Sequence, residues 1–197
     1  MSHEKLLIQK CKNGDVEAFE QLIESYQKKV FGIAFRMLGN TEDASDVAQE
    51  VFLKVFKSIT NFKEESSLST WIYRIATNVC LDEIRKRKKA TVVSINSTIQ
   101  LEDGEIDMQV EDQGPHPDEI VERKELENEV KKAIERLNNE HKIVIILRDI
   151  QGLSYDEIAD ILQCSLGTVK SRINRARNSL KNILLKRKEL LNDYNVK

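Results

Sequence analysis

Helix-breaking residues are scarce in this sequence, in which 7 of 197 residues are glycine and 2 are proline. Both prolines, Pro115 and Pro117, lie outside the stretches where apolar residues recur at helical spacing. Proline and glycine interrupt helices and mark turns and loops. Their scarcity in the periodic stretches predicts a mainly α-helical protein.

Cysteine is also scarce. Cys11, Cys80 and Cys164 are far apart, odd in number and without a Cys-X-X-Cys pair. Each falls in or beside a helical pattern, so we interpret them as small apolar side chains with reduced thiols. This usage suits the cytosol.

Long apolar runs are absent. The first residues have no apolar core of the kind found in signal peptides. No stretch approaches the roughly 18 apolar residues of a membrane-spanning helix. We therefore expect a cytoplasmic protein that is neither exported nor inserted in a membrane.

The net charge is only −2, but the charges are segregated along the chain. Residues 102–119 contain eight acids and no lysine or arginine, whereas residues 164–190 contain eight bases and one acid. Such segregation is typical of proteins that bind a polyanion with one part of their surface. The small net charge argues against a uniformly basic binding surface.

Apolar periodicity divides the chain into three parts. It runs at helical spacing through residues 1–90, disappears in the acidic residues 91–119 and resumes in residues 120–197. The middle segment has few large apolar residues with which to build a core. The sequence therefore predicts an all-α protein with two helical domains, 1–90 and 120–197, joined by a flexible acidic linker at 91–119.

Residues 152–177 have the pattern of a helix-turn-helix. Ser154 and Glu157 have the spacing of a capping box, which predicts the start of one helix. We expect a turn at residues 163–167, where Gly167 can adopt a backbone conformation that larger residues resist. The second helix is predicted to begin near Thr168.

The second helix has one apolar and one polar side. At about 100° per residue, Val169, Ile173 and Ala176 share the inner arc. Short polar residues and one arginine lie opposite, with cations on both flanks. This suits a helix in the major groove, where the centre reaches base edges and the flanks reach phosphates. A merely solvated face is the simpler alternative.

A helix-turn-helix alone does not separate a repressor from a response regulator or a recombinase tail.

A second polar ridge occurs in the N-terminal part. Asp43, Asp46, Gln49 and Glu50 recur at three- and four-residue spacing beside a continuous apolar stripe. A compact acidic and amide ridge favours docking onto a basic protein helix. A plain solvated ridge explains the pattern equally well on physical grounds.

Residues 61–89 combine a serine-rich loop, aromatic residues and a run of five bases at 85–89. Rings and guanidinium groups stack on unpaired bases, and cations follow the phosphate backbone. The segment is therefore a candidate for binding single-stranded DNA. Trp71 can instead be a core residue.

Three segments carry a resemblance to a known family: DASDVAQEVF at 43–52, STWIYRIATN at 69–78 and LSYDEIA at 153–159. In order and spacing they resemble the extracytoplasmic-function (ECF) group of the sigma-70 family, over nearly the whole chain. The resemblance implies an alternative sigma factor, which binds core RNA polymerase and directs it to promoters through −10 and −35 elements. It implies no cofactor, no metal and no catalytic residue.

The resemblance also implies residue roles. The residues implied to dock on the clamp helices of the polymerase β′ subunit are Asp43, Asp46, Gln49 and Glu50. Those implied to capture, melt and read the −10 element are Asn61, Phe62, Ser69, Trp71, Tyr73, Arg74, Asn78 and Arg85. Those implied to read the −35 element from the major groove are Lys170, Ser171, Asn174 and Arg175. Arg172 and Arg177 are implied to bind phosphates. Further implied partners are the polymerase β subunit and an anti-sigma protein that is often membrane-anchored.

Two other functions compete with this interpretation. A stand-alone repressor or activator would use the same helix-turn-helix but would give the ridge at 43–50 no role. A DNA-acting enzyme would need a nucleophile with an arginine cluster, or an acidic metal site. His3, His116 and His141 are scattered, and the carboxylates lie on helix surfaces or in the linker. The sequence therefore disfavours an enzyme.

Overall fold

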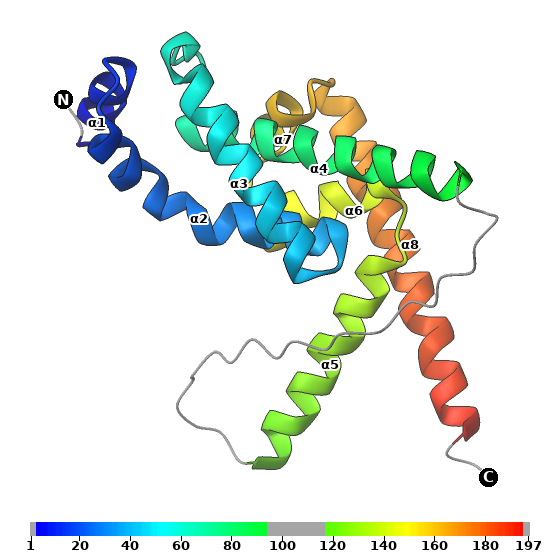
Figure 1. The fold of residues 1–197 in the computed structure, drawn as a ribbon. Coiled ribbons are helices and arrows are strands. Elements are labelled where there is room, and N and C mark those ends of the chain that lie inside the picture. Colours follow the sequence, from blue (N-terminus) through cyan, green and yellow to red (C-terminus); the bar gives the residue numbers. More distant parts are fainter. Residues whose placement is uncertain (1–2, 94–116, 195–197) are drawn as a thin grey trace.

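The computed structural model describes residues 3–93 and 117–194. Every regular element within these ranges is a helix (Figure 1), so the all-α prediction is confirmed there. The N-terminal elements are α1 (His3–Lys12), α2 (Val16–Leu38), α3 (Thr41–Ser58), η1 (Ile59–Asn61) and α4 (Leu68–Val93). The C-terminal elements are α5 (Pro117–Glu135), α6 (Asn139–Ile145), η2 (Ile146–Ile150), α7 (Tyr155–Leu162) and α8 (Leu166–Tyr194).

The predicted linker is shorter at both ends than residues 91–119. Helix α4 continues to Val93, and α5 begins at Pro117. Proline is well suited to a first helical turn, because its missing N–H has no intrahelical acceptor there. The predicted flexible part, residues 94–116, lies outside the described residues.

Helices α1–α4, here called the N-terminal lobe, surround one apolar core. The apolar stripes of α2, α3 and α4 meet at fully buried side chains such as Ile33, Val51 and Ile72. Gly39 ends α2 with a φ of +89°, and the Asn40 side chain accepts a hydrogen bond from the Asp43 N–H to start α3. This close turn lets α2 and α3 pack along each other.

Helices α5–α8, here called the C-terminal lobe, contain the helix-turn-helix as α7 and α8. The predicted capping box is confirmed: Ser154 Oγ accepts from the Glu157 N–H at 3.2 Å, and Glu157 accepts from the Ser154 N–H at 2.8 Å. The prediction for Gly167 was wrong. Gln163 takes the left-handed conformation, with a φ of +50°, whereas Gly167 lies inside α8. The left-handed backbone conformation is therefore needed directly after α7, at Gln163, four residues before Gly167.

The two lobes pack directly against each other. Helix α4 contacts α7, and α2 contacts α5, α6 and η2 (Figure 1). The buried side chains of both lobes form one continuous apolar cluster. Beside it, the Lys131 ammonium lies 5.0 Å from the ring centroid of Phe35, a cation–π distance. The structure thus joins α4 of the N-terminal lobe to α7 of the helix-turn-helix.

No helix within the described ranges has the length and apolar character needed to cross a membrane.

Ser154→Ala removes the side-chain acceptor that starts α7. We expect the free energy of unfolding to fall by about 0.5–2 kcal/mol, the usual effect of losing an N-cap. Urea unfolding followed by helical circular dichroism measures the change. Asn182→Ala, at an exposed position within α8, is the matched control, and an equal effect of both substitutions would contradict the capping role.

Candidate functional site

A cavity of about 320 Å³ lies where the loop after η1 meets α4. It brings together four of the eight residues predicted to contact −10 DNA: Asn61, Phe62, Trp71 and Arg74. The Phe62 and Trp71 rings pack with their centroids 5.0 Å apart, and Arg74 Nε is buried without a hydrogen-bond partner among the described residues. The cavity is therefore lined by the partly buried Trp71 ring, which packs on the buried Phe62, and by the Arg74 side chain.

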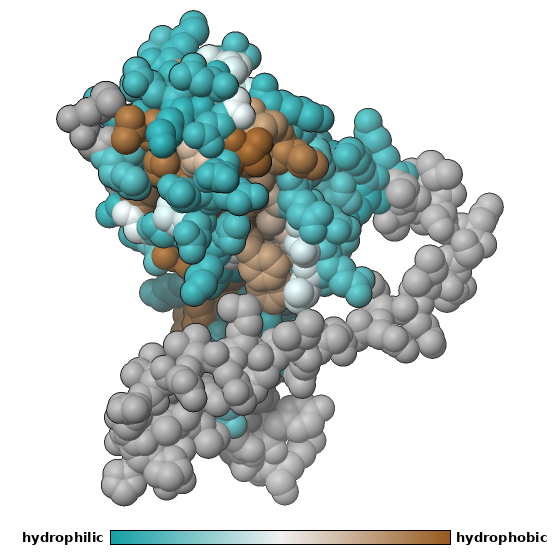
Figure 2. Space-filling view, turned by 60° about the vertical axis from the view of Figure 1, so that its left-hand side comes forward, coloured by the Kyte–Doolittle hydropathy of each residue, from teal (hydrophilic) through white to brown (hydrophobic). Residues whose placement is uncertain are grey.

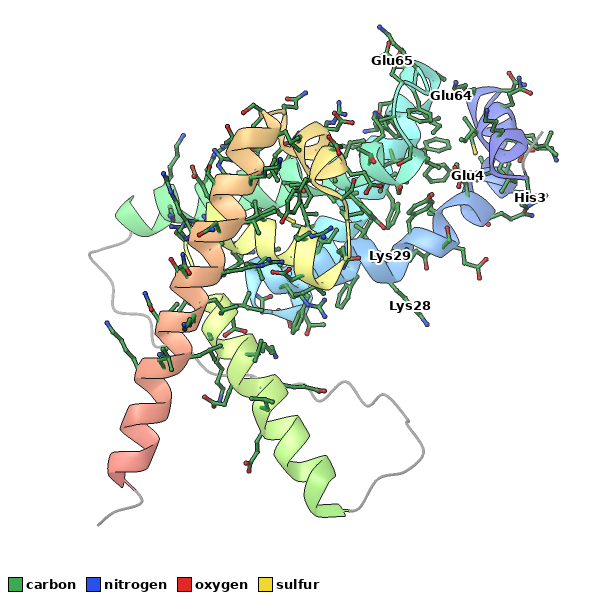
Figure 3. All side chains as sticks on the ribbon, turned by 180° about the vertical axis from the view of Figure 1, so that it is seen from behind. His3, Glu4, Lys28, Lys29, Glu64 and Glu65 are labelled. Carbon is green, nitrogen blue, oxygen red and sulfur yellow. The ribbon has the colours of Figure 1, made fainter. Side chains whose placement is uncertain are left out.

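Helix α1 supports the loop that forms one wall of this cavity. Lys12 Nζ lies 3.1 Å from Glu64 Oε1 and 5.7 Å from the ring centroid of Phe62. Glu64 has a φ of +59°, a conformation that residues other than glycine rarely adopt. In Figure 3, Glu64 lies on the side of the loop next to α1, whereas Glu65 points away. Sequence reasoning missed Lys12, because nothing in the pattern of α1 points to a contact 52 residues away.

The other four predicted −10 residues do not line the cavity. Ser69 is half-buried and hydrogen-bonded to Ser67 Oγ at 2.8 Å. Asn78 is exposed, and the exposed Arg85 pairs with Asp82 at 2.9 Å. Tyr73 is 2% exposed.

The C-terminal lobe forms part of this site, which the sequence did not predict. Asp160 of α7 lines the cavity together with Trp71 and Arg74. Burial raises the pKa of the Tyr73 hydroxyl, and the negative charge of Glu157 on α7 raises it further. Two acids of α7 thus lie near the −10 candidates of α4.

The predicted ridge on α3 is only partly free. Asp46 and Gln49 are exposed, and Glu50 forms a surface ion pair with Lys54 at 2.7 Å. Asp43 instead pairs with Arg87 of α4 and with Asn40. The hydrogen bond from Arg87 lowers the pKa of the Asp43 carboxyl. Asp43 therefore already links α3 to α4 in this structure.

Exposed apolar side chains accompany the ridge. Leu53 is 58% exposed and follows Asp46, Gln49 and Glu50 at helical spacing, and Phe56 lies one turn further on. Figure 2 shows apolar groups scattered among hydrophilic ones on the face that comes forward from the left-hand side of Figure 1. The surface of α3 thus combines acids, an amide and large apolar side chains, as protein-binding helices do.

The first turns of α8 present the predicted −35 residues. Val169, Ile173 and Ala176 are buried, as predicted. The four residues on the outer side are all exposed: Lys170, Ser171, Asn174 and Arg175. The exposed side chains therefore form one polar and cationic strip along the helix.

The two predicted phosphate-binding residues have acidic neighbours. Arg172 lies 3.8 Å from Glu140, and Arg177 donates two hydrogen bonds to Asp149 of η2. Donating these hydrogen bonds to Asp149 raises the pKa of Arg177. A phosphate would have to displace these carboxylates or share the two guanidinium groups with them.

Comparison with protein families identifies the chain. The family model for sigma-70 region 2 matches residues 22–90, and that for sigma-70 region 4 matches residues 127–180. The ECF RNA polymerase sigma factor SigW of Bacillus subtilis is 37% identical over 177 residues, covering 90% of this chain and 94% of SigW. The chain belongs to the ECF sigma factors. The ECF sigma-E factor of Escherichia coli K12 is 34% identical, covering 91% of this chain and 93% of its own.

Solved structures agree with this assignment. The sigma factor RpoE of Bartonella quintana, solved with the anti-sigma factor NepR, matches with a TM-score of 0.67 and 26% identity, covering 84% of this chain and 96% of RpoE. CnrH, solved with the cytosolic domain of CnrY, gives a TM-score of 0.64 and 25% identity over 93% of this chain and 97% of CnrH. This ECF sigma factor is therefore a transcription initiation factor and not an enzyme.

The contact between Lys12, Glu64 and Phe62 predicts a measurable effect on Trp71, the single tryptophan of the chain. Lys12→Ala should loosen the loop and increase acrylamide quenching of Trp71 fluorescence. A double-mutant cycle with Glu64→Ala should give a coupling energy of about 0.2–1 kcal/mol that falls with salt, as for surface ion pairs. Lys10→Ala, on an exposed position of the same helix, is the control; quenching as large in this variant would rule out the specific contact.

Proposed function

We propose that the ECF sigma factor divides promoter recognition between its two lobes. Residues 1–90 bind the opened −10 strand and core polymerase, and residues 120–197 bind the duplex −35 element. The cavity at Asn61, Trp71 and Arg74 is the observation that carries this proposal.

The cavity suits an unpaired base that has left the stack. The partly exposed Trp71 ring can stack on any base, and the partly exposed Arg74 guanidinium can donate to a base edge or a phosphate. Stacking on an aromatic side chain contributes about 1–3 kcal/mol per base, similar to the few kcal/mol that unpairing costs. Capturing a base can therefore hold open a duplex that polymerase has begun to melt. Asn78 and Arg85 extend the binding surface along α4, whereas Ser69 positions the loop.

The strip on α8 suits the major groove. Asn174 and Arg175 have the side chains that read adenine and guanine edges by paired hydrogen bonds. Lys170 and Ser171 reach bases at the beginning of the helix. Arg172 and Arg177 lie toward the flanks and hold phosphates once their acidic neighbours release them.

The α3 surface is the polymerase-docking site of the proposal. Asp46, Gln49 and Glu50 face a basic helix of the β′ clamp, with Leu53 and Phe56 supplying apolar contact. Asp43 contributes by holding α3 against α4 through Arg87. The C-terminal lobe contacts the β subunit, so that polymerase holds both lobes on one promoter.

The regulation we propose follows the relatives solved with anti-sigma factors. A cognate anti-sigma protein binds this chain and blocks its polymerase-binding surfaces until a signal releases it. The sigma factor then acts in the cytoplasm, and a membrane-anchored partner would hold it at the inner face of the membrane.

Run-off transcription tests the proposed function directly. Purified core RNA polymerase is supplied with this protein and fragments of the source genome, and the start sites are mapped. We expect new transcripts whose upstream regions share two elements. A protein that forms no complex with core polymerase, or that starts no new transcript, would contradict the proposal. Operator binding without polymerase would instead favour a stand-alone repressor.

Charge reversal on α3 tests polymerase docking. Asp46→Lys places a cation opposite a basic helix, and we expect affinity for core polymerase to fall by about tenfold or more, about 1.4 kcal/mol. Glu42→Lys makes the same charge change at another exposed position of α3. Titration of labelled core polymerase should separate the two variants; equal loss in both would assign the effect to net charge alone.

Two substitutions on α8 separate base reading from phosphate binding. Arg175→Ala should weaken binding to the preferred promoter by about 1–3 kcal/mol and relax the preference at one −35 position. Arg172→Ala should weaken all promoters equally and reduce the salt dependence by about one counterion. Holoenzyme binding to a −35 library at several salt concentrations measures both. Identical sequence preferences in the two variants would refute the assignment.

A further inference from the structure

We propose that helix α1 sets the base preference of the −10 cavity, with Lys12 as the residue that positions the loop at 62–66. This inference rests on the proposed function of the cavity, in which an unpaired base is captured there, and it adds a determinant of which base is preferred. Helix α1 ends at Lys12, and the family model for sigma-70 region 2 begins only at residue 22. The determinant therefore lies outside the residues that the family model matches.

The loop is fixed at both ends by the helices that flank it. At its start, the buried Phe62 donates a backbone hydrogen bond to the Ile59 carbonyl of η1 at 3.1 Å. At its end, Ser67 Oγ accepts a hydrogen bond from the Thr70 N–H at 3.1 Å, which caps the start of α4. These contacts hold the two ends of the loop and leave residues 63–66 between them.

The middle of the loop is held from α1. Within the described ranges, the bond between Lys12 and Glu64 at 3.1 Å is the only side-chain hydrogen bond or ion pair that residues 63–66 form. The φ of Glu64 is +59°, a conformation that costs free energy in residues other than glycine. A contact that fixes the Glu64 side chain therefore also favours this backbone conformation over extended ones.

Helix α1 is a rigid support for this contact. The residues on its inner side that are buried in the core are Leu7, Ile8 and Cys11. Near its start, Glu4 accepts a hydrogen bond from the Tyr26 hydroxyl of α2 at 3.4 Å. Because Lys12 is the last residue of α1, its ammonium group reaches the loop from a backbone that this packing holds in place.

The position of the loop matters because the loop lines the cavity. The lining includes residues 61–64 of the loop together with Trp71 and Arg74 of α4. Hydrogen bonds to a base edge need donor–acceptor distances of about 2.7–3.2 Å, so a displaced loop no longer fits one base better than the others. Stacking on Trp71 does not distinguish bases and survives such a displacement. Losing the contact therefore weakens discrimination between bases more than it weakens capture.

The two halves of the ion pair separate positioning from electrostatics. Lys12→Ala leaves an unpaired acid at the cavity, which repels a DNA phosphate, whereas Glu64→Gln leaves an unpaired lysine, which attracts one. Simple electrostatics therefore predicts opposite changes in affinity for DNA. Positioning predicts the same loss of base preference in both variants, because both break the same contact.

The experiment uses holoenzyme made from core polymerase and the full chain, with a promoter library randomised in the −10 and −35 elements. We expect Lys12→Ala and Glu64→Gln each to relax the preference at one −10 position by about two- to fivefold, the range that an exposed ion pair provides. The −35 preference should stay unchanged, which shows that the variants are folded and bound to polymerase. Lys12→Arg keeps the charge and the reach of the side chain and should keep the −10 preference.

Two matched variants make the same charge changes without touching the contact. Lys10→Ala is at an exposed position of α1, and Glu65→Gln is at the next residue of the loop, whose side chain points away from α1 (Figure 3). Both should shift affinity with the sign of their charge and leave the −10 preference as it is. Relaxation as large as in Lys12→Ala, or a −10 preference that neither Lys12→Ala nor Glu64→Gln changes, would overturn the positioning role.

The same library separates this inference from the proposed function. If the unmodified holoenzyme selects both elements and every variant matches it, α1 does not position the loop, and the division of promoter recognition between the lobes stands. If the unmodified holoenzyme selects no −10 sequence, the proposed function of the cavity fails, and the positioning role fails with it.

Discussion

The structure depends on the register of amphipathic helices, because each surface proposed for recognition is the outer side of a helix whose inner side is core. Val169, Ile173 and Ala176 anchor α8, which turns Asn174 and Arg175 outward. Since successive residues are about 100° apart, a shift of one position would turn every side chain by about 100°, which would expose part of the core and move the readers off the outer side. The positions of the apolar residues in the sequence thus determine which side chains of α8 face outward.

The interface between the lobes lies beside the proposed −10 surface of α4. Asp160 of α7 lines the cavity together with Trp71 and Arg74 of α4, whereas Asn78 and Arg85 on the same helix stay exposed. The buried side chains of both lobes form one continuous apolar cluster, and the contact between Lys131 and Phe35 lies beside it. In the proposed function polymerase binds both lobes, and its contacts would replace part of this interface.

Features that repeat along one helix could be predicted from the sequence. Helical spacing indicated the buried side of α8, and the Ser154–Glu157 pair indicated the start of α7. Features that depend on distant segments could not: Lys12 meets Glu64 only after folding, and Asp160 reaches the cavity only through contact between lobes. The turn after α7 was misassigned because glycine is the usual residue at positive φ, and here Gln163 adopts that conformation.

The distance between the lobes, before and after polymerase binds, tests the account most directly. Donor and acceptor dyes can be placed on cysteines introduced at Lys28 of α2 and Lys181 of α8, both exposed, in a chain with Cys164→Ser. Energy transfer should be high in the free protein and should fall when core polymerase is added. Low transfer in the free protein, or transfer that polymerase leaves unchanged, would contradict the account.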